Sequence, residues 1–96
     1  DIISDFSISQ NYPNPFNSST QIQYYLPQLA NVKLRVFDVL GREVATLVNG
    51  EMQPLGQHVV NWNGLNNAGI GVATGTYVYR IEAGEFRDEK KMVLVK

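Results

Sequence analysis

Apolar and polar residues alternate over many short stretches of the chain, as they do in a β-strand with one buried face. In the stretch 20–26, for example, Ile22, Tyr24 and Leu26 share one face. Glycine, proline and asparagine interrupt the alternation too often for helices of ordinary length. The pattern predicts about seven strands, over residues 6–11, 20–26, 31–39, 42–48, 56–62, 76–83 and 86–95. Seven short strands divided by turns are typical of an antiparallel β-sandwich.

The alternation also predicts which side chains point into the core. The inward positions are Tyr24, Leu34, Val36, Val60, Trp62, Tyr77, Tyr79 and Ile81. A one-residue slip in register would expose the whole set. Tyr25 and Phe37 lie opposite their apolar neighbours, so they are the best candidates for an exposed contact patch. A sugar-binding platform built from Tyr24, Tyr25, Tyr77, Tyr79, Trp62 and Phe37 is an alternative, although such alternation is typical of core aromatic residues.

Two segments are less regular than the others. Apolar residues recur at helical spacing over residues 42–48, but the β-branched residues and the flanking glycines favour a strand. Asn49 and Gly50 follow as a predicted tight turn with positive φ. Residues 63–75 are rich in glycine and asparagine and are predicted to form a surface loop.

Length and composition limit what the chain can be. We expect a single domain over residues 1–96 and, because the first residue is Asp1, a piece of a longer protein. The 8 basic and 9 acidic residues give a net charge of −1, which excludes nucleic-acid binding through a basic surface. No apolar run is long enough to suggest membrane insertion. The absence of cysteine excludes disulfides, thiolate nucleophiles and cysteine-bound metals.

Side chains that carry catalysis are scarce in this sequence. His58, the single histidine, lies on the apolar side of a strand and is interpreted as a packed or half-exposed residue rather than a general base. The adjacent carboxylates Asp88 and Glu89 point to opposite faces of a strand, so they do not form a facing pair. We therefore expect no enzyme activity, no metal centre and no cofactor.

Three weaker patterns have structural as well as functional interpretations. The glycines between Gly69 and Gly75 resemble a nucleotide-binding fingerprint, but their spacing is wrong and they lead into a strand, which favours turn glycines. Asn63, Asn66 and Asn67 could be a degraded calcium loop, although such loops rely on charged oxygens. Asn17 begins a formal glycosylation sequon, which is a weak signal on its own.

Five sequence blocks, taken in order, resemble a known family. They occupy residues 11–17, 36–44, 61–64, 75–80 and 90–94. Together they closely resemble the C-terminal sorting domain of the type IX secretion system, and the related immunoglobulin-like domain of flagellar hook-capping proteins. The resemblance runs from about residue 8 to residue 96. It implies an immunoglobulin-like antiparallel β-sandwich of about seven strands.

The resemblance also implies a function without catalysis. Sorting domains direct a cargo, which lies upstream in the same polypeptide, to the secretion machinery of the outer membrane. The cargo reaches that machinery through the periplasm, a surface peptidase often removes the domain, and the protein ends up secreted or on the cell surface. The acidic residues common after the tryptophan are asparagines here, which weakens any metal role.

Some residues of the blocks are interpreted as structural. They are Pro13, Pro15, Asp38, Gly41, Trp62, Gly75 and Tyr77. The prolines remove backbone donors and should end the pairing of the first strand. Asp38 is expected to cap the turn that contains Gly41. A side chain at Gly41 is expected to clash. The two aromatic residues are expected core anchors, and the last glycine a turn glycine.

The predicted recognition segment is the C-terminal strand. It comprises Lys90, Lys91, Met92, Val93, Leu94, Val95 and Lys96. A partner can bind an amphipathic strand at a free terminus through edge pairing and side-chain pockets. The ordinary interpretation is a last strand whose lysines protect an exposed edge. Two other functions stay open: a structural interaction module of the hook-capping type, and an accessory carbohydrate-binding module of a secreted enzyme.

Overall fold

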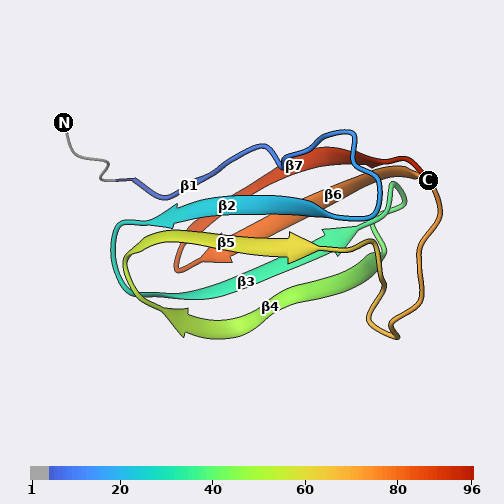
Figure 1. Cartoon of the computed structure of the whole chain (residues 1–96). Coiled ribbons are helices and arrows are strands. Elements are labelled where there is room, and N and C mark those ends of the chain that lie inside the picture. The colour runs from blue at the N-terminus through green and yellow to red at the C-terminus, as the bar shows by residue number, and fades with distance from the viewer. Residues whose placement is uncertain (1–4) are drawn as a thin grey trace.

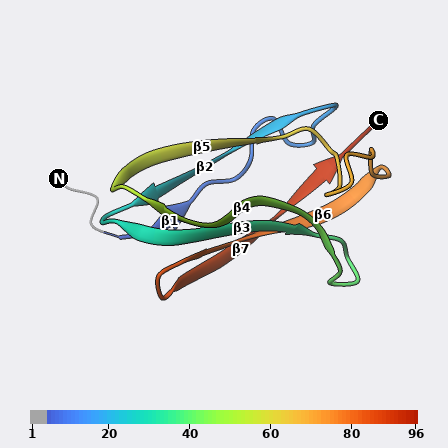
Figure 2. The same ribbon diagram turned by 90° about the horizontal axis from the view of Figure 1, so that it is seen from below.

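Seven strands form two antiparallel sheets in the computed structural model, which describes residues 5–96 (Figure 1). The strands are β1 (Ser7–Ile8), β2 (Thr20–Leu26), β3 (Ala30–Phe37), β4 (Glu43–Gln53), β5 (Gly56–Trp62), β6 (Gly75–Ala83) and β7 (Phe86–Leu94). One sheet has the order β1-β2-β5 and the other the order β4-β3-β6-β7. Figure 2 shows the two sheets as packed layers. The predicted antiparallel sandwich is confirmed. Residues 5–96 include no helix with the length and apolar character needed to cross a bilayer.

The strand bounds differ most from the predicted ones at β1 and β4, and the others lie within two residues of the prediction. β1 is only two residues long. β4 continues to Gln53, so the predicted tight turn at Asn49 and Gly50 is wrong. Gly50 has a φ of 69° and is the extra residue of a bulge, because the residues on either side of it pair with consecutive residues of β3. Residues 43–48 are strand, so the helical alternative for this segment is wrong as well.

The core lies between the two sheets and follows the predicted alternation. The predicted inward side chains are buried except for Val60, which is half-buried and packs against the core. Trp62 is the centre of an aromatic cluster, with its ring centroid 5.7 Å from that of Phe16 and 5.5 Å from that of Tyr77. Tilted and edge-on ring contacts of this kind add to the stability that burial alone provides.

A buried hydroxyl joins the N-terminal segment to the four-stranded sheet. Tyr79 in β6 donates a hydrogen bond to the carbonyl oxygen of Ser9 at 2.6 Å. Burial raises the pKa of Tyr79 to about 12. The hydroxyl therefore keeps its proton, and this bond persists, through the physiological pH range.

Candidate functional site

The predicted recognition segment forms the end of β7, which is the outer strand of the four-stranded sheet. Lys91, Val95 and Lys96 are exposed, Lys90 and Val93 are half-buried, and Met92 and Leu94 are fully buried. The two fully buried side chains therefore belong to the hydrophobic core. A partner of the folded domain can contact only the other five side chains of the segment.

Lys90 and Lys91 do not form one basic patch. Successive residues of a strand point to opposite faces of the sheet. Lys90 lies on the side of the buried Met92, whereas Lys91 lies on the outer face. Within residues 5–96 neither lysine forms an ion pair. Replacing Lys90 therefore changes the charge on one side of β7 and replacing Lys91 changes it on the other. Neither replacement breaks a salt bridge within residues 5–96.

The outer edge of β7 is covered by the N-terminal segment 10–16. The backbone N–H of Phe16 donates to the carbonyl oxygen of Val93, and the carbonyl oxygen of Phe16 accepts from the N–H of Val95, both at 2.9 Å. The side-chain oxygen of Asn14 accepts from the N–H of Val93 at 3.0 Å. Because these outward-facing groups are already paired, a partner strand cannot add to this part of β7 unless the segment moves away.

A buried polar network holds segment 10–16 in place. Asn11 and Thr20 are buried, and the Asn11 side-chain amide donates to the Thr20 hydroxyl oxygen at 3.0 Å. The Thr20 hydroxyl donates in turn to the carbonyl oxygen of Pro13 at 2.9 Å. The peptide bonds before Pro13 and Pro15 are both cis. The two prolines thus belong to the segment that covers β7, a role that the sequence interpretation did not foresee.

Asp38 caps the turn between β3 and β4. Its Oδ1 accepts from the backbone N–H groups of Leu40 and Arg42 at 2.9 and 3.0 Å, and its Oδ2 accepts from the Arg42 guanidinium at 2.8 Å. The backbone N–H of Arg42 is the main reason that the pKa of Asp38 lies below its ordinary value. Gly41 has a φ of 81°, but a Cβ there would touch nothing within 4 Å. The predicted clash is therefore wrong: backbone conformation, not space, favours this glycine.

Trp62 and Tyr77 position the loop before β6 as well as filling the core. The indole N–H of Trp62 donates to the carbonyl oxygen of Leu65 at 2.9 Å. The hydroxyl of Tyr77 donates to the carbonyl oxygen of Ala73 at 2.6 Å. Gly75 is the first residue of β6, and its φ lies outside the left-handed region. The loop is therefore tied to the core at both of its ends.

Asn66 and Asn67 use their side-chain oxygens within the protein, whereas the exposed Asn63 makes no side-chain hydrogen bond within residues 5–96. Oδ1 of Asn66 accepts from the N–H groups of Ala68 and Ile70 at 2.9 and 3.0 Å. Oδ1 of Asn67 accepts from the N–H of Thr46 in β4 at 2.9 Å. Across residues 5–96 no group of three or more His, Cys, Asp or Glu side chains could hold a metal ion. A cation would have to compete with these backbone donors for the amide oxygens.

His58 is a packed strand residue. Its ring stacks on the ring of Tyr24, with centroids 5.3 Å apart, and its Nε2 lies 2.8 Å from the carbonyl oxygen of Pro54. The side chain is half-buried. These neighbours supply packing and one backbone oxygen, not the carboxylate that orients a catalytic histidine.

The six aromatic residues considered from the sequence do not form an exposed platform. Tyr24, Tyr77, Tyr79 and Trp62 are buried in the core. Phe37 lies on the outer face of the four-stranded sheet but is only 7% exposed. The Arg80 and Arg35 guanidinium carbons cover its ring, 4.3 and 5.2 Å from the centroid. The prediction that Phe37 is exposed is therefore wrong, and Tyr25 alone of the six is half-buried.

Charged side chains gather on the outer face of the four-stranded sheet. Arg35 lies 3.5 Å from both Glu43 and Glu82, and Arg80 lies 3.0 Å from Glu89. These pairs are partly exposed, so each contributes little to stability by itself. Opposite charges on adjacent strands nevertheless favour the observed register over its alternatives.

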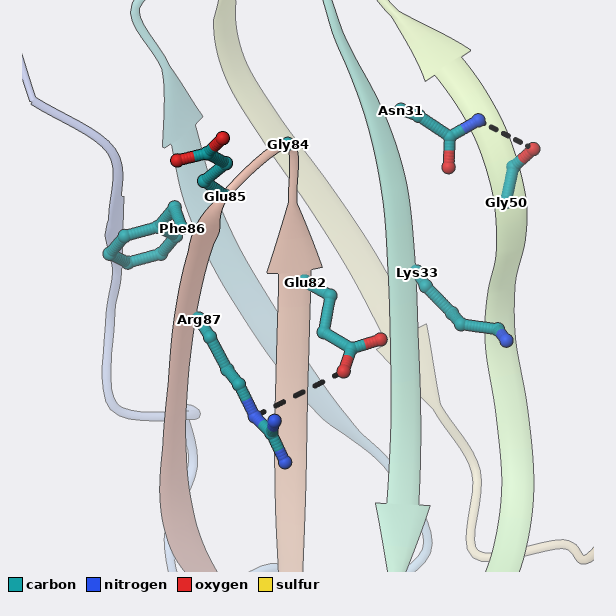
Figure 3. A pocket seen from close by; sticks show the side chains of 8 residues that line it. All are labelled: Asn31, Lys33, Gly50, Glu82, Gly84, Glu85, Phe86 and Arg87. Atoms are coloured by element: carbon teal, nitrogen blue, oxygen red, sulfur yellow. Dashed lines mark hydrogen bonds and ion pairs between the residues drawn. The ribbon is translucent and has the colours of Figure 1, made fainter.

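An open depression lies at one end of this charged face, where residues of β3 and β4 meet the β6–β7 turn (Figure 3). It is lined by Asn31, Lys33, Gly50, Glu82, Gly84, Glu85, Phe86 and Arg87. Arg87 and Glu82 point toward each other at 4.0 Å, and the Asn31 amide donates to the carbonyl oxygen of Gly50 at 3.2 Å. Two basic and two acidic side chains leave the depression without net charge. Its lining provides polar contacts and contains no histidine or hydroxyl nucleophile.

Comparison with known proteins identifies the architecture. Residues 14–85 match the family described as FlgD Ig-like domain. Dimeric latent PorU from Porphyromonas gingivalis is 21% identical over 99% of this chain, with a TM-score of 0.75. PorZ, described as an essential bacterial surface component of the type IX secretion system of the same species, is 18% identical over 95%, with a TM-score of 0.60.

These likenesses concern a small part of much longer proteins. The chain spans 10% of the PorU chain and 11% of the PorZ chain. At such low identities they show a shared fold, and with the family match they make the sandwich immunoglobulin-like. No match was found among curated proteins.

Proposed function

The chain belongs to the FlgD Ig-like domain family, and from that premise we propose that it is a non-catalytic C-terminal module that sends a secreted protein through the type IX secretion system. In this proposal the cargo lies upstream in the same polypeptide and passes through the periplasm to the outer membrane. The partner is the secretion machinery there, and the destination is the cell surface or the medium. A surface peptidase is the proposed agent of any later removal of the domain.

The likeness of 95% of this chain to a part of PorZ is the observation that carries this proposal. PorZ is described as a surface component of the type IX secretion system, and 95% of this chain superposes on about a tenth of it. A domain of this shape therefore occurs within a larger protein of that system. The five blocks that resemble the sorting domain support the same function.

The segment with the proposed sorting role lies outside the family match, which ends at residue 85. Because segment 10–16 covers the edge of β7, the proposed contact uses exposed side chains rather than strand addition. Lys91, Val95 and Lys96 are the exposed members of the segment. The machinery is thus proposed to bind the outer face of β7 and the exposed residues that follow it.

The test is delivery of a fused reporter in a host with this secretion system. The variant changes Lys90 and Lys91 to Gln, and Lys33→Gln on the opposite side of the charged face is the matched control. Neither Lys90 nor Lys91 forms a described ion pair, so the melting temperature should stay unchanged. We expect the double variant to accumulate in the periplasm and the control to reach the surface.

A second variant separates recognition from folding. Deleting Val95 and Lys96 removes the exposed end of the segment and the backbone bond from Val95 to Phe16, but it leaves the buried Met92 and Leu94 in place. Loss of surface delivery with a folded domain would support the sorting role. If the double variant and this deletion both reach the surface normally, the segment does not carry the signal.

A structural interaction module of the hook-capping type is the second candidate, favoured by the family match itself. Such a module would bind other proteins without directing transport. A reporter that stays in the periplasm although fused to the unaltered domain would favour this second function over sorting.

A further inference from the structure

Every charged side chain that lies in a named strand belongs to the four-stranded sheet. β1, β2 and β5 contain no Asp, Glu, Lys or Arg. No such residue occurs in the stretches 6–32 and 52–79 at all. The outer face of an ordinary domain is about a quarter to a third charged. A whole sheet without charge is therefore a property of this molecule that its fold alone does not require.

The outer face of this sheet presents amide and tyrosine side chains. We call it the neutral face, and it consists of Gln21, Gln23 and Tyr25 on β2 with Gln57, Val59 and Asn61 on β5. These residues alternate with inward ones and pair across the two strands in three rows. The Gln57 amide donates to the Gln23 side-chain oxygen at 3.3 Å. The Gln21 and Asn61 amides make no hydrogen bond within residues 5–96, so their donors and acceptors face solvent.

Tyr12 stands at the end of the neutral face and is 78% exposed. Its backbone is nevertheless fixed, because its N–H and carbonyl groups both pair with Gln21 at 2.9 Å. Its neighbour Asn11 is buried in the network described above. An open depression of about 450 Å³ lies beside the ring, lined by Tyr12, Pro13, Ser19, Thr20, Gln21 and Asn61. Because the backbone of Tyr12 is already ordered, a ligand that binds its ring pays only for ordering the side chain.

We propose that the neutral face, together with Tyr12, binds a neutral oligosaccharide. Sugar hydroxyls both donate and accept hydrogen bonds, and the carboxamides of Gln and Asn offer both functions from one side chain. The apolar face of a pyranose ring can lie against an exposed tyrosine ring, whose own hydroxyl stays in water. An uncharged ligand also fits a face where no charged side chain would lose its water on binding.

Other classes of ligand fit the neutral face less well. A nucleic acid or an acidic polysaccharide would need lysine or arginine, and the face has neither. A protein interface would need an apolar core, and Val59 is the single aliphatic residue among the six. The absence of charge and the amide side chains of this face therefore favour the neutral sugar.

The proposal can be tested with hexasaccharides of glucose, xylose and mannose, and with polygalacturonate as an acidic comparison. Amide chemical shifts of the ¹⁵N-labelled chain are followed during titration to about 10 mM sugar, which nearly saturates a complex with a Kd near 1 mM. We expect shifts on the neutral face for at least one neutral sugar and none for polygalacturonate. Tyr12→Ala should weaken binding about tenfold and Tyr12→Phe should preserve it.

Val39→Ala is the matched control, because Val39 is 72% exposed on a loop far along the chain from the neutral face. Both alanine variants should keep the melting temperature of the parent, since each removes an exposed side chain. Absence of shifts with every neutral sugar would overturn the proposal. So would binding that survives Tyr12→Ala, or concentration-dependent broadening of neutral-face signals without sugar, which would assign the face to a second copy of the chain.

Discussion

Two five-residue loops at the same end of the sandwich share one geometry but differ in chemistry (Figure 1). They are residues 38–42 between β3 and β4, and residues 66–70 between β5 and β6. In each, the side-chain Oδ1 of the first residue accepts from the N–H groups of the third and fifth residues, at 2.9 and 3.0 Å. The fourth residue is a glycine with a φ of 81° in one loop and 79° in the other. The first residue is Asp38 in one and Asn66 in the other.

This comparison shows what the carboxylate adds. The backbone turn forms with a neutral amide, so charge is not needed for its geometry. The carboxylate of Asp38 adds an ion pair with Arg42 and a dependence on pH that Asn66 lacks. The comparison also gives a structural reason for the asparagine at position 66, which the sequence analysis considered as a cation ligand. Its side-chain oxygen accepts the two backbone hydrogen bonds that close the turn.

The two loops also differ in how they are attached to the rest of the protein. Loop 38–42 belongs to one hairpin, so its neighbours in sequence hold it. Loop 66–70 lies in a longer connection and is held by Trp62 through Leu65 and by a backbone bond from Asn67 to Val44. Stability of the second loop should therefore depend on the core far more than stability of the first.

The largest effect is expected from a change that tests this difference in attachment. Trp62→Phe removes the indole N–H that binds Leu65 and leaves space in the aromatic cluster. We expect the free energy of unfolding to fall by about 2–4 kcal/mol, as for other core truncations that leave a polar group unpaired. Urea denaturation measures it. Amide shifts should change in loop 66–70 and not in loop 38–42; equal changes in both would show that the attachments are equivalent.

The alternation of side chains was enough to predict the fold, because a period of two specifies which face of each strand is buried. It placed Trp62 and Tyr77 in the core correctly. It could not predict that segment 10–16 covers β7, since the bond from Phe16 to Val93 joins residues far apart in the sequence. Nor could it predict the bulge at Gly50, which depends on the pairing of both strands.

Signals for the candidate sites were only partly readable in the sequence. Phe37 looked exposed because its strand position is outward, and only the folded sheet brings Arg80 over its ring. The charge-free stretches 6–32 and 52–79 could have been seen directly. So could the repeated spacing of Asp or Asn three residues before a glycine, which marks both loops.

A smaller effect is expected from replacing the glycine of each loop. Gly41→Ala and Gly69→Ala put a Cβ into open space, so their cost comes from the left-handed backbone alone, roughly 1–2 kcal/mol each. Gly75→Ala is the matched control, because Gly75 also has open space but an ordinary φ, and we expect almost no loss. Urea denaturation should give equal losses for the two loops. A clearly larger loss at Gly69 would mean that the two turns are not equivalent.

The smallest effect is expected from acid, and it should separate the two loops by charge. The pKa of Asp38 is lowered, first by the N–H of Arg42, so folding favours the carboxylate form. The stabilisation is then complete above the pKa of the unfolded chain and is lost as the pH falls through the lower folded value. The amide shifts of Leu40 and Arg42 should therefore titrate below about pH 4, while those of Ala68 and Ile70 stay constant.

Asp38→Asn makes the first loop resemble the second and gives the decisive control for this titration. The amide retains an oxygen that accepts from Leu40 and Arg42, but it has no proton to gain in acid. We expect the titration of the Leu40 and Arg42 shifts to disappear in this variant. The carboxylate of Glu43, next to this loop, also has a lowered pKa, first because of its hydrogen bond with the Thr46 hydroxyl. Its titration could affect the same amide shifts, so Glu43→Gln is measured in parallel. If the Leu40 titration survives Asp38→Asn and vanishes with Glu43→Gln, then Glu43 and not Asp38 makes the first loop sensitive to acid.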